Sequence, residues 1–406
     1  MGTPQNKTQI LIFLCLVLFL DAVGFGLILP VLPGLISELS DFPNSQAAII
    51  AGYLLFTFAI MQFFCAPILG ALSDRFGRRP ILLIALLGFS LDYFVMAAAP
   101  NLVWLFIARM ISGVFGATYA AANASIVDIS TPGERAKIFG WGGAAVGLGF
   151  VFGPAIGGLL GEYGTRIPFV VAGVLVLLTT VYGFFTLKET LVPENRRLFS
   201  WRRANPLGNI ITIARYPIVL IILVSVFFMQ LANHSYSSIW PFYTIEVAQW
   251  SPFLIGLSVA FYGIMLAMVQ GGLTGPAVKM FGEVRMGLFS YALGIMVFIG
   301  LAFAANGAQI YIWIFIGGFT AFAYPVTQAL MTKNTPENAQ GELQGALASS
   351  YSLSAIIGPL FMSQLFGIYT DEGGRYFPGA PFLGACVLII ISAAIFSYGI
   401  KSSMTQ

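Results

Sequence analysis

The sequence predicts an all-α polytopic membrane protein with twelve transmembrane helices in two six-helix halves. Of its 406 residues 58% are apolar and only 9% charged, with a mean hydropathy of +0.89, whereas a soluble domain carries about 25% charged residues. The apolar residues gather in long runs, and the two halves share landmarks at a constant spacing. A chain so poor in charge cannot solvate a globular surface, so most of its surface should face lipid.

Twelve runs approach the roughly 20 mostly apolar residues that a transmembrane helix needs. All should be helical, because lipid-exposed backbone groups must be paired within the segment. The first run is too long for a signal-peptide core and no small-residue cleavage pattern follows it, so we expect it to be retained. The runs lie near residues 10–32, 47–72, 80–99, 102–128, 138–160, 167–187, 218–240, 252–278, 286–305, 308–332, 342–369 and 380–400.

Positive charge in the loops predicts the orientation. Of the 19 Lys and Arg residues, 16 fall in loops on one side of the predicted bundle; the exceptions are Arg109, Arg166 and Arg375. Short loops rich in Lys and Arg stay in the cytoplasm. We therefore expect an inner-membrane protein with both termini cytoplasmic.

The longest polar stretch, residues 188–217, follows the sixth run on that side. It is expected to link an N-terminal half, residues 1–187, to a C-terminal half, residues 218–406. An interfacial helix around Trp201 is expected within it.

Glycine and proline landmarks recur in the two halves at a spacing of 205 residues. They are Gly77 and Gly282, Gly113 and Gly318, and the pairs Gly153-Pro154 and Gly358-Pro359. Agreement in three pairs of spans indicates an internal repeat. Parallel six-helix repeats place a substrate site near the membrane midplane, between the halves.

The loop between spans two and three reads GALSDRFGRRP, from Gly70 to Pro80. Gly70 and Gly77 should permit close backbone approach, and the arginines should hold the loop in the cytoplasm. Those arginines are Arg75, Arg78 and Arg79. Asp74 contributes little to topology; either it latches neighbouring helices or the loop is an ordinary positive-inside loop.

This loop resembles the signature loop of the major facilitator superfamily, and most of all that of bacterial tetracycline/proton antiporters of the twelve-span drug/proton antiporter family. The resemblance covers most of the first half, and the second half only in outline. It runs through Leu91–Tyr93, Ile107–Ala117, Ala124–Asp128 and Phe139–Gly158, and then Leu343–Gly345 and Ile357–Pro359. It implies that Asp74, Arg78 and Asp128 form a cytoplasmic charge network that gates alternating access.

The fifth span carries small residues at steps of four, Gly149, Gly153, Gly157 and Gly161. Such a stripe lets helices pack backbone to backbone, and Pro154 removes one helix hydrogen bond. Close packing alone would explain the stripe. The string GPAIGG, which ends at Gly158, resembles a motif of antiporters rather than symporters, and so favours export.

Three ionisable residues fall inside spans: Asp21, Asp92 and Arg109. A charge at the bilayer centre costs about 2.5–3.5 kcal/mol or more, and such residues usually mark a pathway or have a partner. One interpretation is an Asp92–Arg109 pair that merely neutralises itself. The antiporter resemblance places all three at functional positions, so we expect Asp21 or Asp92 to carry the proton and Arg109 to tune it or bind substrate.

Span seven carries a polar face formed by Gln230, Asn233, His234 and Ser237. His234 is the only histidine, and an ordinary imidazole pKa of about 6.5 would suit proton exchange; the alternative is a hydrogen-bonded helix contact. Further candidates for lining the substrate site are Gln62, Asn123, Tyr236 and Trp240.

The chain departs from the best-known tetracycline exporters in its second half. Span eight has no histidine, and span nine has no charge, with Gly294 near the position of the expected acid. These departures argue against tetracycline itself as the substrate, and they predict that the residues for proton coupling lie in the first half. Aromatic residues make up 15% of the chain, and a pocket lined by some of them would suit a planar or amphipathic compound.

The resulting prediction is a secondary transporter that exports a small amphipathic molecule, a drug or a tetracycline-like compound, in exchange for protons. Open alternatives are an exporter of a native metabolite such as a siderophore, and a non-transporting receptor or scaffold. No G-x-x-x-x-G-K-[ST] loop and no Cys/His cluster occurs, so an enzyme, an ATP-driven pump, a cofactor and a metal site are not expected. The expected partners are substrate, protons and the lipid bilayer, not nucleic acid, and the protein is expected to act as a monomer.

Overall fold

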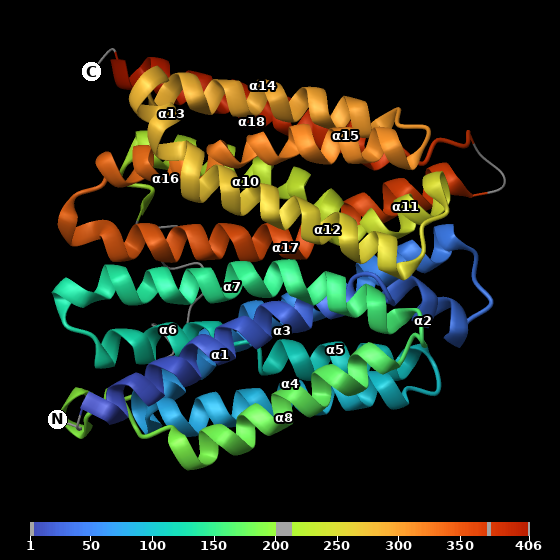
Figure 1. Ribbon diagram of the computed structural model, residues 1–406. Coiled ribbons are helices and arrows are strands. Elements are labelled where there is room, and N and C mark those ends of the chain that lie inside the picture. Colours follow the sequence, from blue (N-terminus) through green and yellow to red (C-terminus); the bar gives the residue numbers. More distant parts are fainter. Residues whose placement is uncertain (1–3, 200–212, 372–374, 405–406) are drawn as a thin grey trace. The chain divides into compact units, whose positions relative to one another are not determined.

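The computed structural model describes residues 4–199, 213–371 and 375–404, and these are helical without any strand (Figure 1). Within them 12 helical segments are long and apolar enough to cross a membrane. This confirms the predicted fold class and number of spans. The interfacial helix predicted around Trp201 lies outside the described residues.

The first six spans are built from eight helices. They are α1 (Pro4–Ile28), α2 (Leu32–Leu39), α3 (Asn44–Phe76), α4 (Arg78–Ala98), α5 (Leu102–Val114), α6 (Thr118–Ile129), α7 (Pro132–Gly161) and α8 (Ile167–Thr186). A short 3-10 turn, η1 (Pro193–Asn195), follows α8.

The last six spans begin with α10 (Pro217–Ser238), α11 (Trp240–Ala248) and α12 (Pro252–Met268), which continues through a π-helical turn, η2 (Val269–Leu273), into α13 (Thr274–Phe281). They continue with α14 (Glu283–Ala302), α15 (Gly307–Gly318), the 3-10 turn η3 (Phe319–Phe322), α16 (Ala323–Lys333), the 3-10 turn η4 (Glu337–Ala339), α17 (Gln340–Thr370) and α18 (Ala380–Met404).

Spans four and ten are interrupted, and the repeated glycines mark both interruptions. Gly113 lies just before the break between α5 and α6, and Gly318 lies at the end of α15. A methyl group on Gly113 would come within 2.6 Å of Met61 Cβ, and one on Gly318 within 2.6 Å of Met265 Cβ. Each glycine therefore lets the broken helix lie against a neighbouring span.

Local capping explains several helix starts. The Asn101 side chain accepts a hydrogen bond from the Val103 amide at the start of α5, and Asn306 does the same at the start of α15. Thr131 and Glu134 form a capping box at the start of α7. Such caps satisfy amides that the first helical turn leaves unpaired.

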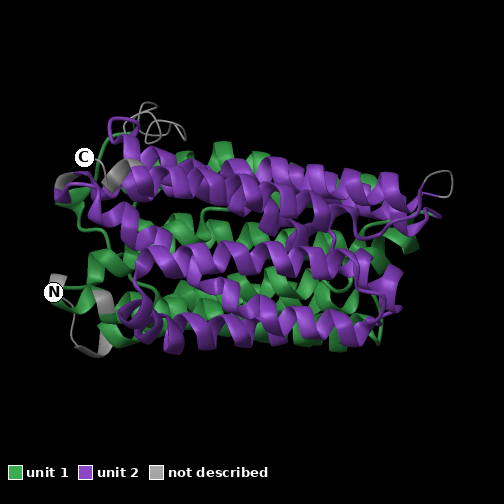
Figure 2. Cartoon of the chain, turned by 90° about the horizontal axis from the view of Figure 1, so that it is seen from above, with its two compact units in different colours: residues 1–40, 57–206, 252–260 green, residues 41–56, 207–251, 261–406 purple. Residues whose placement is uncertain are grey.

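The chain divides into two compact units (Figure 2). Unit 1 comprises residues 1–40, 57–206 and 252–260, and unit 2 comprises residues 41–56, 207–251 and 261–406. Each unit thus contains most of one sequence half and a short segment of the other. The half boundaries given above, 1–187 and 218–406, stay a prediction.

Each unit has its own helix packing. In unit 1, α1 packs against α7 and α8, and α4 against α5, α6 and α8; in unit 2, α10 packs against α17 and α18, and α14 against α15, α16 and α18. The most tightly joined pair of unit 1, α1 and α7, carries Asp21 and the glycine stripe.

Candidate functional site

A buried ion pair lies in unit 1 between α4 and α5. Arg109 Nη2 donates to Asp92 Oδ2 at 2.5 Å, and the two side chains are 11% and 1% exposed. The other carboxylate oxygen, Asp92 Oδ1, and the Arg109 Nε are also buried and make no hydrogen bond of good geometry with described residues, although the Ser112 hydroxyl lies near the carboxylate. The pair is therefore neutral in sum, with one acceptor and one donor left over.

Tyr93 connects this pair to Asp21. It follows Asp92 in α4, is 5% exposed, and lies within electrostatic reach of Asp21, Asp92 and Arg109. Its hydroxyl fills the space where a side chain on Gly24 would lie. Gly24 lies three residues after Asp21 on the same face of α1. The structure thus pairs two of the three ionisable residues predicted from the sequence, and Asp21 lies within electrostatic reach of Tyr93 beside them.

The glycine stripe of α7 packs on the part of α1 that carries Asp21. A methyl group on Gly149 would lie 2.6 Å from the Phe19 carbonyl oxygen, and one on Gly153 would lie 2.7 Å from the Val23 carbonyl oxygen. Gly157 meets the Leu27 backbone in the same way. The predicted backbone-to-backbone packing is confirmed for these three glycines, with α1 as their partner, whereas Gly161 meets the side chains of Val31 and Pro252.

The end of the stripe serves another neighbour. Pro154 packs against Gly26 of α1, while Gly158 faces the backbone of Pro252 and Phe253 at the start of α12. The motif therefore packs α7 against α1 and against the start of α12, residues 252–260, which belong to unit 1.

The turn from α3 to α4 carries a second charge cluster, which we call the Arg78 network and define as Ser73, Asp74, Arg78 and Asp128. The Arg78 guanidinium lies 2.6 Å from Asp74 and 3.1 Å from Asp128, and donates to the Ser73 hydroxyl. One arginine between two carboxylates forms the network that the resemblance implies. Its gating role stays a prediction.

The other predicted members of this loop take different positions. Arg79 donates to the Phe184 carbonyl oxygen at the end of α8, and Arg75 is exposed and stacks on the neighbouring Phe76. Gly77 has a positive φ of 109°. The close approach expected at Gly70 is wrong for the described residues, because an added methyl group there would meet nothing within 4 Å; the loop turns at Gly77 alone.

In unit 2 the polar face of α10 is divided. His234 Nδ1 lies 3.1 Å from the Ser237 hydroxyl and Nε2 lies 3.4 Å from the Ser354 hydroxyl of α17, and its ring covers Gly358. Asn233 is exposed, whereas Gln230 is half-buried. His234 therefore sits in a helix contact, the alternative considered for it; its part in proton coupling stays a prediction.

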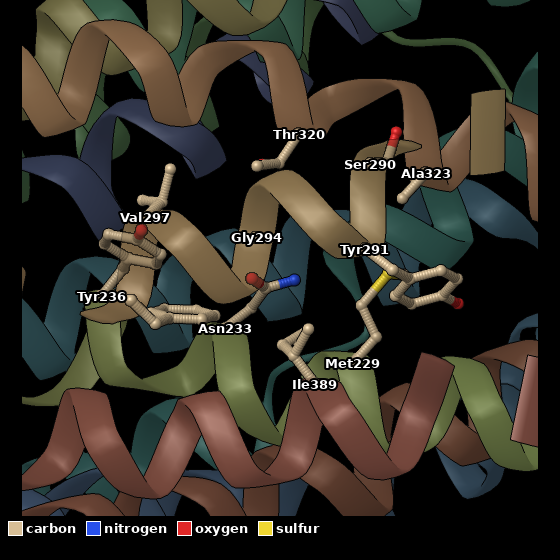
Figure 3. A pocket seen from close by; sticks show the side chains of 11 residues that line it. Met229, Asn233, Tyr236, Ser290, Tyr291, Gly294, Val297, Thr320, Ala323 and Ile389 are labelled. Atoms are coloured by element: carbon tan, nitrogen blue, oxygen red, sulfur yellow. The ribbon is translucent and has the colours of Figure 1, made fainter. Parts of the chain in front are cut away.

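A small polar cavity of about 40 Å³ lies among α10, α14, α18 and the span containing η3 (Figure 3). Its polar groups come from Asn233, Tyr236, Ser290, Tyr291 and Thr320, and Gly294 also lines it. One water needs about 10–15 Å³, so the cavity suits a few waters and not an aromatic ring. None of the described residues that line it is charged.

Aromatic rings gather beside this cavity. Tyr236 stacks on Tyr262 with ring centroids 5.6 Å apart, and also contacts Trp240 and Phe298. Tyr236 is half-buried, but Trp240 is only 3% exposed. Of the two aromatic residues predicted to line the substrate site, only Tyr236 presents much surface.

Gln62 and Asn123, the remaining lining candidates, lie in unit 1. The Gln62 amide donates to the Gly116 carbonyl oxygen at the break between α5 and α6, so it also stabilises that break. Asn123 is half-buried in α6. The same break separates Asn123 in α6 from Arg109 in α5.

Sequence reasoning missed Tyr93 and Glu189. Tyr93 lies in the quoted Leu91–Tyr93 string, so its position next to Asp92 was an available signal. Glu189 follows α8 and accepts hydrogen bonds from the α4 amides of Arg78 and Arg79. No local pattern announces a contact between residues so far apart in the chain.

The chain matches the model of the Major Facilitator Superfamily over residues 14–359 and 273–403. It is 38% identical to the class C tetracycline resistance protein of Escherichia coli, with 93% of each chain covered. It is also 38% identical to the class G tetracycline resistance protein of Vibrio anguillarum (92% and 94% covered), and 28% identical to multidrug resistance protein 2 of Bacillus subtilis (strain 168) (96% and 95% covered).

Solved structures agree on the fold. A bacterial homologue of the human lysosomal transporter Spinster, in an inward-facing and unoccupied conformation, matches with a TM-score of 0.80 at 16% identity, covering 100% of this chain and 99% of that one. The human organic anion transporter MFSD10 matches with a TM-score of 0.72 at 21% identity, covering 97% and 100%.

Proposed function

The chain belongs to the Major Facilitator Superfamily, and on that premise we propose that it exports a small amphipathic molecule in exchange for protons by alternating access. It is a multi-pass membrane protein, and its relatives include proteins named for tetracycline and multidrug resistance. These names support a drug or a tetracycline-like planar compound as substrate. We place the protein in the inner membrane as a monomer, with both termini and the Arg78 network on the cytoplasmic side.

The buried Asp92–Arg109 pair carries this proposal. One Asp92 oxygen makes no hydrogen bond of good geometry, and the side chain is 1% exposed. A proton can bind to this oxygen, and the net charge of the pair then changes. Protonation of Asp92 would leave the Arg109 guanidinium with an uncompensated positive charge, which disfavours the binding of a substrate that itself carries positive charge. Deprotonation restores the neutral pair and lets that substrate bind, so proton and substrate exclude each other, as antiport requires.

Asp21 supplies the alternative proton site. It is half-buried on the helix against which α7 packs, and lies within electrostatic reach of Tyr93, as the pair does. Its partial exposure suits the exchange of a proton with an aqueous cavity, whereas Asp92 is sealed. We therefore assign Asp21 the exchange with water and Asp92 the control of Arg109.

Proton release from inside-out vesicles tests the proposal. Vesicles with an acidic lumen are challenged with tetracycline, other planar amphipathic drugs and siderophores, while a pH-sensitive dye reports lumenal protons. Asp92→Asn and Asp21→Asn are compared with Asp41→Asn, which removes an exposed carboxylate. Substrate-dependent proton release should be lost in the first two variants and kept in the third.

Uptake of a labelled compound without any proton response would point to a facilitator and refute antiport. Proton release unchanged by both Asp21→Asn and Asp92→Asn would refute the assignment of the coupling residues. Neither uptake nor proton release with any compound on the panel would count against export of this substrate class.

A further inference from the structure

We propose that Glu189 is a positioning residue for the Arg78 network, which it joins to the chain segment that leaves α8. The inference rests on the proposed function, because only a transporter gives that network a gating role. Its geometrical part, an interhelical anchor made by one carboxylate, can be tested without transport. Glu189 belongs to the polar stretch after the sixth span, which the sequence predicts only as a linker.

The Glu189 carboxylate accepts four backbone hydrogen bonds. Oε1 accepts from the amides of Arg78 at 2.8 Å, Thr190 at 3.0 Å and Leu191 at 3.0 Å, and Oε2 accepts from the Arg79 amide at 3.3 Å. Two of these amides are among the first of α4, which have no partner within their own helix. A negative charge at that end of a helix is also favoured by the helix dipole.

Gly77 makes room for this carboxylate. A side chain on Gly77 would overlap the Glu189 carboxyl group, and the φ of 109° is one that glycine adopts without strain. Gly282, its counterpart in the internal repeat, also has a positive φ, of 83°, but an added methyl group there meets nothing within 4 Å. Glycine is thus required for turn geometry in both halves, and for a bound carboxylate only in the first.

The same segment touches the network at two more points. The Thr190 hydroxyl donates to Asp128 Oδ2 at 3.4 Å, the oxygen that also accepts from Arg78 Nε. The Arg197 amide donates to the Asp74 carbonyl oxygen at 3.0 Å. Both acids that hold the Arg78 guanidinium are therefore contacted by residues that follow α8.

These contacts define what Glu189 does. It holds the backbone of Arg78, while Asp74 and Asp128 hold the side chain, so the guanidinium keeps its place between two acids. Without Glu189 the first turn of α4 would loosen, and Arg78 would more often lose one acid. A gate that must re-form in every transport cycle would then re-form more slowly, which lowers kcat and leaves KM unchanged.

Amide hydrogen exchange of the detergent-solubilised full chain tests the anchor directly. In Glu189→Ala the amides of residues 78–79 and 190–191 should exchange faster by on the order of tenfold or more, because each loses a charge-assisted hydrogen bond. Glu189→Gln keeps one oxygen that can accept three of the four bonds, and should restore most of the protection. Glu194→Ala, which removes an exposed acid of the same segment, should leave exchange unchanged.

Vesicle proton release at varied substrate concentration tests the positioning role. Glu189→Ala should lower kcat at least about fivefold with KM unchanged, and Glu189→Gln should lie between it and the wild type. Unchanged amide exchange in Glu189→Ala would overturn the anchor. Faster exchange with unchanged kcat would overturn the positioning role. Faster exchange in a protein whose wild type releases no protons would refute the gating role and the proposed function, and leave the anchor standing.

Discussion

Replacing Gly153 of α7 by alanine should loosen the helix pair that carries Asp21. The new methyl group would lie 2.7 Å from the Val23 carbonyl oxygen and 2.9 Å from Val23 Cα. Carbon contacts are comfortable at about 3.5–4.0 Å, so α7 and α1 must separate by roughly 0.6–1 Å. Neither neighbour is the end of a flexible side chain, and the strain must be absorbed by the backbone.

The size of the effect follows from two opposing terms. Overpacking of this kind costs about 1–3 kcal/mol, while alanine gains about 1 kcal/mol over glycine in helix propensity. Gly147, in the same helix, is exposed and has nothing within 4 Å, so Gly147→Ala carries only the propensity term. The two variants should therefore differ by about 1–3 kcal/mol, which is roughly 5- to 150-fold in the unfolding equilibrium.

Unfolding in mixed dodecyl sulfate and mild-detergent micelles, followed by tryptophan fluorescence, measures that difference. Gly153→Ala should unfold at a lower dodecyl sulfate fraction than Gly147→Ala, and should also lose substrate-dependent proton release because Asp21 moves with α1. Equal unfolding curves and equal proton release for the two variants would show that α7 does not grip α1 as described.

Two further predictions concern charged pairs. Asp92→Asn leaves Arg109 buried without a counter-charge and should destabilise by about 3–5 kcal/mol; the double variant Asp92→Asn/Arg109→Gln should recover part of this in the same unfolding assay, and strictly additive losses would contradict the pairing. Hydrogen bonds from Thr165 and Arg166, together with the charge of Arg166, hold the pKa of Glu38 below its ordinary value, so the pair stabilises the fold above the unfolded pKa of about 4.3 and this is lost as pH falls through the lowered value. Glu38→Gln should thus be less stable than wild type at pH 7, by at most about 1 kcal/mol for so exposed a pair, and this difference should shrink as the pH falls through the lowered pKa of Glu38; a difference that grows on acidification would refute this sign.

Much of the fold could be predicted because lipid imposes a simple rule on sequence. A span must be long, apolar and helical, so twelve runs predict twelve helices. The repeat also paired Gly113 with Gly318, and the structure shows that these two glycines lie at equivalent breaks. The breaks themselves were not predicted, because a short turn within an apolar run leaves hydropathy unchanged.

The candidate site was predictable where a residue is costly in its surroundings. Asp92 and Arg109 stand out because a charge inside a span needs a partner, and the structure pairs them. Residues whose side chains are ordinary where they stand give no such signal. Glu189 lies in a polar loop where acids are common, so its anchoring contacts could not be predicted from composition. Trp240 is one of many aromatic residues, so the burial of its ring could not be predicted either.

The contacts of Glu189 and Arg197 with the Arg78 network have a consequence for expressing the protein as two separate polypeptides. A first fragment that ends at Leu187, where the apolar run stops, lacks the carboxylate that covers the start of α4. A first fragment that extends through Phe199 carries every contact that the described segment makes with the Arg78 network. When it is co-expressed with residues 213–406, the longer fragment should restore substrate-dependent proton release and the shorter fragment should not. The boundary between the two halves that preserves function therefore lies beyond the residue at which hydropathy would place it.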